Sequence, residues 1–363
     1  MSTVKCYNFL CLSATNGGSS NGRTAGFGPA YWGSNPYPPA SVFVVIAPLT
    51  QANYFAIKIM YNFRMADIGQ TNVTLVQTET ADKLVLNGIL SIPNKNSKNI
   101  VLHIHGTSGS FYWNSFYSYL SKMSVDLGLT FLATNNRGSG VYEVEKGTVY
   151  HGASLEKFED CLLDIDAWIE FCLSKGYTNI ILEGHSFGTE KSVYYLVKGK
   201  YKDKIKAVIL LGFSDTVGTQ RSYEKKIGKN YFEEANKLVG ENRGEYLLTD
   251  LGALCGELPI SAQTYLNYFS ENSACSMALP LRNGRDLKYF QKITVPILGV
   301  IGDKDDGEYT IIPINDAIKL LNSENIHAEA YKIKDCNHGF DGKEVELAKI
   351  VETFLTQKIL TLE

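Results

Sequence analysis

The sequence has no acidic residue in its first 65 positions, although it holds 38 Asp and Glu residues in total. An even distribution would place about seven acids there. Residues 13–40 are rich in Gly, Ser, Asn and Pro and follow neither a helical nor an alternating period, so no packed core is expected in them. We therefore expect residues 1–65 to be a leader, either disordered or lying before a true start at Met60 or Met65.

Paired cysteines are also missing. The seven cysteines are scattered along the chain, their number is odd, and no C-x-x-C spacing occurs. This distribution argues against a disulfide framework and against a zinc site, so neither a metal nor a disulfide scaffold is expected. Reduced thiols are typical of the cytoplasm, which is the location that we predict.

Long apolar runs and excess positive charge are absent as well. The apolar run at residues 42–49 is far shorter than the roughly 20 residues of a membrane span, so no span is expected. The net charge of −3 gives phosphate no electrostatic reason to bind, so no nucleic-acid partner is expected. With 44% hydrophobic residues in 363, the chain can still build one sizeable core.

Beyond residue 70, short apolar strands alternate with amphipathic helices. The strands are expected at residues 73–79, 84–92, 99–106, 130–138, 179–185, 206–212, 296–302 and 326–333. The helices are expected at residues 111–128, 154–176, from Ser186 onward, 314–322 and 343–360. Such alternation predicts an α/β fold: a mainly parallel eight-stranded sheet with helices on both faces, after two antiparallel strands.

The alternation stops between residues 216 and 290, where the sequence is helical and rich in aromatic residues. A stretch of this length between two strands predicts an inserted helical cap. The core would then comprise residues 66–215 and 291–363. Aromatic side chains in such an insertion usually form its own core, so they give only a weak indication of an aryl substrate.

Residues 184–188, Gly-His-Ser-Phe-Gly, match the G-x-S-x-G pattern of a nucleophile elbow. The pattern alone is weak, because residues 18–22 of the leader match it too. Ser186, however, follows an apolar strand and precedes a helix-compatible run, as an elbow requires. The helix N-terminus would place N–H groups where an oxyanion develops. Ser186 is therefore the candidate nucleophile.

The chain from about residue 70 to 360 resembles the α/β-hydrolase superfamily, in particular its serine esterase and lipase-like members. The resemblance implies the α/β-hydrolase fold and a Ser-His-Asp triad that works without a cofactor. It also implies that the acid and then the base follow the nucleophile in the sequence. Of the two later histidines, His338 lies in the expected loop after the last strand, whereas His327 begins a strand and is expected to be structural.

The acid is expected just past the strand at residues 296–302, where three aspartates are found. The resemblance indicates Asp305, with Asp306 as the second candidate and Asp303 ordering the turn. The segment His105-Gly106-Thr107 resembles the oxyanion segment of the family, which implies that the backbone N–H groups of Thr107 and Phe187 hold the oxyanion.

A metal site at His103 and His105 is the alternative for that segment, because alternation places both on one side of a strand. No third ligand follows at a suitable spacing, so no metal is expected. The sequence thus predicts a serine hydrolase that cleaves a small-molecule carboxylic ester through an acyl-enzyme. A thioesterase, a peptidase and a non-catalytic ligand receptor on the same fold are the alternatives. The oligomeric state is not predicted.

Overall fold

The computed structural model describes residues 73–145, 149–304 and 306–362. The leader predicted at residues 1–65 lies outside the described residues. None of the described helices is both long enough and apolar enough to cross a membrane.

Eight strands form one sheet in the order β1-β2-β4-β3-β7-β8-β9-β10. Their bounds are β1 (Val73–Glu79), β2 (Val85–Ser91), β3 (Asn99–Ile104), β4 (Thr130–Thr134), β7 (Asn179–His185), β8 (Ile205–Leu211), β9 (Ile297–Gly302) and β10 (Ala328–Ile333). Strand β2 pairs antiparallel with both β1 and β4, and the other neighbours are parallel. The predicted sheet is therefore confirmed, including its antiparallel start.

Several strands are shorter than expected at their C-terminal ends. The strand expected at residues 99–106 ends at Ile104, and the one expected at 130–138 ends at Thr134. Beyond these points the chain turns away from the ladder into loops at the edge of the sheet, beginning with His105-Gly106 and Asn135-Asn136. All residues of β3, β4 and β9 are buried, because helices cover both faces of the sheet.

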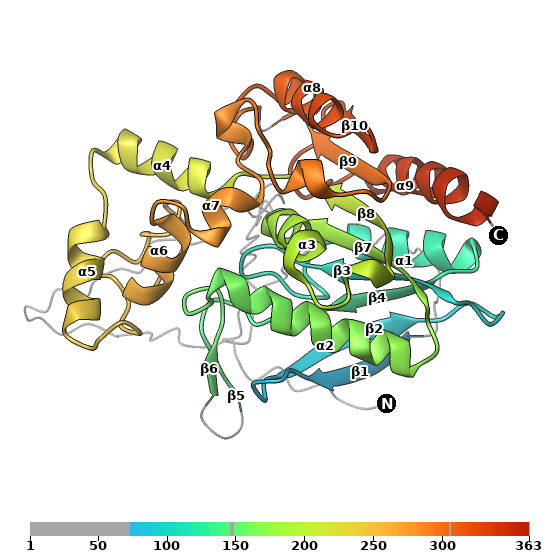
Figure 1. Cartoon of the computed structure of the whole chain (residues 1–363), viewed down its shortest axis with the longest axis horizontal. Helices are drawn as coiled ribbons and strands as arrows, with labels where there is room; N and C mark the ends of the chain where they lie inside the picture. Colours follow the sequence, from blue (N-terminus) through green and yellow to red (C-terminus); the bar gives the residue numbers. More distant parts are fainter. Residues whose placement is uncertain (1–72, 146–148, 305, 363) are drawn as a thin grey trace, which may run out of the picture. The chain divides into compact units, whose positions relative to one another are not determined.

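Two separate apolar clusters pack on the two faces of the sheet. Figure 1 shows the helices that lie over the sheet. Helices α1 (Phe116–Asp126) and α9 (Glu344–Lys358) belong to one cluster. Helices α2 (Cys161–Ser174), α3 (Phe187–Lys198) and α8 (Ile314–Glu324) belong to the other. The prediction of helices on both faces is thus confirmed.

Two local features differ from the expected elements. Helix α2 begins at Cys161 rather than at residue 154, because the preceding segment bonds to the insertion: the Ser261 N–H donates to the Ser154 carbonyl (2.8 Å). A small hairpin of β5 (Glu143–Glu145) and β6 (Val149–His151) lies between β4 and α2, where no strand was expected. Strands of three residues are too short for a periodic signal.

The stretch 216–290 is helical and projects beside the sheet at one of its ends (Figure 1). It contains α4 (Thr216–Ile227), α5 (Phe232–Gly240), α6 (Ala262–Phe269) and α7 (Ala274–Ala278). Its large aromatic side chains are mostly buried in one cluster with Phe158 and Phe187. The aromatic composition thus serves the packing of this helical insertion and gives no indication of the substrate.

Candidate active site

Ser186 lies at the turn between β7 and α3, with φ 54° and ψ −126°. A positive φ strains any residue with a Cβ, and such strain is concentrated at functional sites. The turn closes only because glycines flank the serine. A Cβ on Gly184 would lie 2.3 Å from the Gly188 carbonyl oxygen, and one on Gly188 would lie 2.3 Å from the Ile104 carbonyl oxygen. The serine itself remains half-buried and accessible.

The segment after β3 lies directly against this serine. A Cβ on Gly106 would lie 2.8 Å from the Ser186 Cβ and 3.3 Å from its Oγ. Thr107, the next residue, is half-buried. Phe187 begins α3, where the first backbone N–H groups have no partner within the helix. The structure therefore places the chain just before Thr107 beside Ser186, while Phe187 directly follows the serine.

His338 lies in the loop between β10 and α9, and it reaches the elbow through His185. The His185 Nε2–H donates to the His338 carbonyl (2.9 Å), because a carbonyl oxygen can only accept. The two rings lie 5.1 Å apart between centroids. Gly212, the first residue after β8, lies close to both rings. A Cβ on it would lie 3.1 Å from the His338 Cε1 and 3.4 Å from the His185 Nε2. Leu211, the residue before Gly212, accepts a hydrogen bond from the Ser186 N–H (2.9 Å). The end of β8 therefore contacts both Ser186 and His338.

The environment keeps both of these imidazoles neutral. Burial, followed by the proximity of His185, holds the pKa of His338 well below its usual range. Burial lowers the pKa of His185 to about 4. A neutral imidazole at ordinary pH is the state in which a histidine accepts a proton.

The three candidate acids differ in what the structure assigns to them. Asp305 lies outside the described residues. The Asp303 carboxylate accepts from the Asp335 N–H (2.7 Å), which ties this turn to the loop of His338. The Asp306 carboxylate accepts from the Ile314 N–H (2.7 Å) at the start of α8. Asp303 and Asp306 thus both hold backbone in place.

Tyr309 is a neighbour of His338 that the sequence did not indicate. Its ring stacks on the imidazole, with centroids 3.8 Å apart and planes inclined by 16°. Tyr309 follows the aspartate turn in a long connection to α8, where no periodic pattern separates a site residue from a surface tyrosine.

His103 and His105 do not form a metal site. The His103 Nδ1 lies 2.6 Å from the Glu183 carboxyl oxygen, and both side chains are buried. The His105 Nδ1–H donates to the Gly106 carbonyl (2.7 Å), and its Nε2 accepts from the Asn136 N–H (3.1 Å). Across residues 73–145, 149–304 and 306–362, no group of three or more possible ligands could hold a metal ion.

Glu183, two residues before His185, is a second buried residue near the site that the sequence did not indicate. Burial raises its pKa to about 8 and lowers that of His103 to about 3. At neutral pH a protonated carboxyl group therefore donates to a neutral imidazole between β3 and β7. Glutamate is rarely fully buried unless it is paired, and its partner His103 lies far away in the sequence. The burial of Glu183 was therefore not evident from the sequence.

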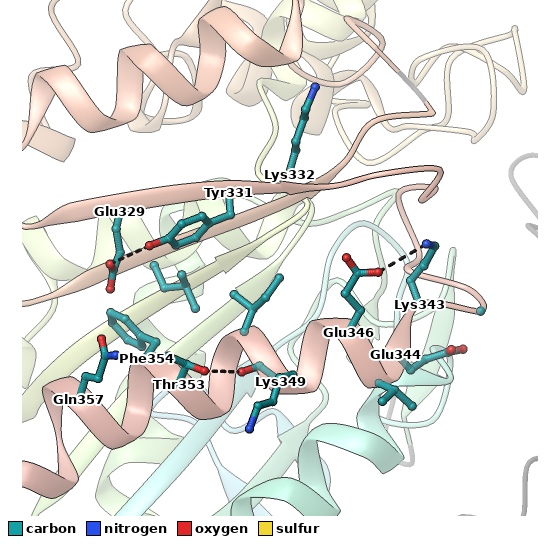
Figure 2. A pocket seen from close by; sticks show the side chains of 14 residues that line it. Glu329, Tyr331, Lys332, Lys343, Glu344, Glu346, Lys349, Thr353, Phe354 and Gln357 are labelled. Atoms are coloured by element: carbon teal, nitrogen blue, oxygen red, sulfur yellow. Dashed lines mark hydrogen bonds and ion pairs between the residues drawn. The ribbon is translucent and has the colours of Figure 1, made fainter.

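A groove of about 800 Å³ lies elsewhere, between β10 and α9 (Figure 2). Its apolar lining includes Leu298, Ile350 and Phe354, and glutamates and lysines line it as well. None of the predicted site residues lines it.

The sequence matches the family model described as the alpha/beta hydrolase fold over residues 99–338. No curated protein matches it. Among solved structures, Est1E from Butyrivibrio proteoclasticus with ferulic acid bound is 18% identical, covering 78% of this chain and 100% of that chain, with a TM-score of 0.56. The Pyrococcus furiosus esterase Pf2001 is 16% identical, covering 80% of this chain and 92% of that chain, with a TM-score of 0.51.

The alpha/beta hydrolase GrgF from Penicillium sp. sh18 is also 16% identical, covering 80% of this chain and 99% of that chain, with a TM-score of 0.52. At these identities the similarity establishes a shared fold. The family match, by contrast, spans well over half of the sequence and includes both Ser186 and His338. The chain therefore belongs to the alpha/beta-hydrolase family.

Proposed function

We propose that this protein is a serine hydrolase that cleaves a carboxylic ester of a small molecule. The observation that carries the proposal is the strained, accessible Ser186 at the strand-to-helix turn, with Gly106 packed against it. A serine without such a strained turn, and without a glycine such as Gly106 packed against it, would be an ordinary surface residue. The esterase Pf2001 and the ferulic-acid complex of Est1E support an ester as the substrate class.

In the proposed reaction, the Ser186 Oγ attacks the ester carbonyl carbon while His338 accepts the hydroxyl proton. The backbone N–H groups of Thr107 and Phe187 stabilise the oxyanion. The ester C–O bond then breaks, and His338 gives its proton to the leaving alcohol. Water, deprotonated by His338, then attacks the acyl carbon. The bond from that carbon to the Ser186 Oγ breaks, His338 returns the proton to the Oγ, and the acid leaves. Asp305 would orient the imidazole and stabilise its charged form.

The helical insertion 216–290 would act as the cap over this site. Its aromatic cluster contains Phe187, the residue next to the nucleophile, and Phe158 from the start of α2. Contact with the oxyanion residue is what a cap that shapes the acyl site would require. We also propose that the protein acts in the cytoplasm, because the described cysteines are unpaired thiols.

The test is turnover of an ester panel with 4-nitrophenyl esters of increasing chain length and a feruloyl ester. Ser186→Ala and His338→Ala are each expected to lower kcat by several orders of magnitude. The double variant should lose little more, because the two groups act as a unit. Thr353→Ala on the exposed face of α9 is the matched control and should turn over like the unmodified protein.

Additive losses in the double variant would contradict a shared triad. A single stoichiometric release of nitrophenol, with no further turnover, would indicate a ligand receptor instead of an enzyme. Faster turnover of thioesters or peptides than of every ester in the panel would overturn the assignment of the substrate class.

A further inference from the structure

The imidazole of His338 has an aromatic neighbour that no catalytic step uses. The Tyr309 ring lies parallel to it, at 3.8 Å between centroids and 16° between planes. We propose that Tyr309 is a positioning residue, whose ring fixes the orientation of the His338 imidazole relative to Ser186. This inference rests on the proposed function, since it assigns a role in the same reaction.

The backbone contact of His338 does not fix its ring. The hydrogen bond from His185 Nε2–H to the His338 carbonyl (2.9 Å) anchors the peptide and does not itself set the orientation of the ring. Gly212 closes in on the Cε1 and Nδ1 atoms without a side chain of its own. A flat ring against the imidazole face restricts rotation in a way that these backbone contacts do not.

Tyr309 is itself held by the base of the helical insertion. Its carbonyl oxygen accepts from the Asp215 N–H (2.8 Å), and the neighbouring Glu308 carbonyl accepts from the Thr219 hydroxyl (3.3 Å). Asp215 is buried and paired with Arg282, whose N–H also donates to it (2.8 Å). The backbone at Tyr309 is therefore held at the start of α4, where the buried Asp215–Arg282 pair lies.

The contact is between faces of rings, so the aromatic ring rather than the hydroxyl is the part that positions His338. Phenylalanine should replace Tyr309 without loss, whereas leucine, which has no planar face, should not. The same ring also keeps water from the imidazole. Removing it should hydrate His338 and move its titration toward that of a free histidine.

The experiment compares Tyr309→Phe and Tyr309→Leu by kcat, KM and the pH profile of kcat/KM with a nitrophenyl ester. Y309L is expected to lower kcat by about ten- to a hundredfold, because small displacements of a catalytic group are this costly. KM should change by less than about twofold, and the midpoint of the pH profile should rise. Y309F should keep both the rate and the midpoint.

Tyr331→Leu is the matched control, because Tyr331 is an exposed tyrosine on β10 that bonds to Glu329 and not to the site. Thermal melting confirms that each variant is folded. If Y309L does not fold, Tyr309→Met provides a longer and more flexible side chain without a planar ring for the same comparison.

Two outcomes would overturn the inference while leaving the proposed function intact: wild-type rates and pH profile in Y309L, or a loss in Y309F equal to that in Y309L. The proposed function is checked separately with a fluorophosphonate probe. If the unmodified protein shows neither ester turnover nor labelling that depends on Ser186, both the function and the role of Tyr309 fail.

Discussion

At the scale of single residues, the site depends on the absence of side chains as much as on their presence. Gly106 leaves the space that Ser186 occupies, since its missing Cβ would lie 2.8 Å from the serine Cβ. Gly106→Ala should therefore push the proposed oxyanion segment away from the proposed nucleophile and lower kcat about a hundredfold. The same crowding should cost roughly 1–3 kcal/mol of stability. Steady-state kinetics and urea unfolding measure the two effects.

Gly240→Ala is the control, because no atom lies within 4 Å of the Cβ that it would add at the end of α5. This variant should keep full activity and normal stability. Unchanged kcat in G106A would show that the segment after β3 does not contact the reacting ester.

The sequence was informative where a residue carries a local signature and uninformative where only tertiary contact matters. Ser186 stands at a strand-to-helix boundary, and His338 is the histidine between the last strand and the last helix, so the places of both in the fold were predictable, while their catalytic roles stay predictions. Tyr309 and Glu183 have no such signature. The partners of these two residues lie 29 and 80 positions away, and only the sheet order brings them together.

At the scale of elements, the parallel pairing of β3 with β7 sets His103 directly opposite Glu183. Burial raises the pKa of Glu183 to about 8, so the folded protein retains a proton that the unfolded chain loses near pH 4.5. Its contribution to stability is present below pH 4.5 and is lost as the pH rises toward 8. Glu183→Gln keeps a donor to His103 Nδ1 without this loss.

The unfolding free energy of E183Q should therefore increase relative to that of the unmodified protein between pH 5 and 8, on the order of 3 kcal/mol in total. Urea unfolding at several pH values measures the difference. Glu79→Gln on β1 is the control, because Glu79 is exposed and its ion pair with Lys83 lies at the surface, so its loss should change the unfolding free energy little. A difference that stays constant over this range would mean that Glu183 is ionised in the folded protein.

At the scale of the whole molecule, the sequence predicted the order of elements well but not how the insertion joins the core. The α/β alternation is a local pattern repeated along the chain, and the eight-stranded sheet follows from it. The connection between insertion and core instead depends on single buried charges. Asp215 begins α4, and Arg282 bonds to it from the far end of the insertion. Nothing in the spacing of these two residues marks them as partners.

The Asp215–Arg282 pair leads to a prediction about how the molecule unfolds. Arg282→Met leaves the fully buried Asp215 carboxylate without its partner, which should cost about 3–5 kcal/mol. Phe158 and Phe187 of the core share one apolar cluster with the insertion, so we expect a single unfolding transition shifted to lower urea. Arg285→Met is the control, because Arg285 and its partner Asp286 are both exposed, and the change should be small. Two separated transitions in R282M would show that the insertion and the sheet unfold independently, and that the buried pair stabilises only the insertion.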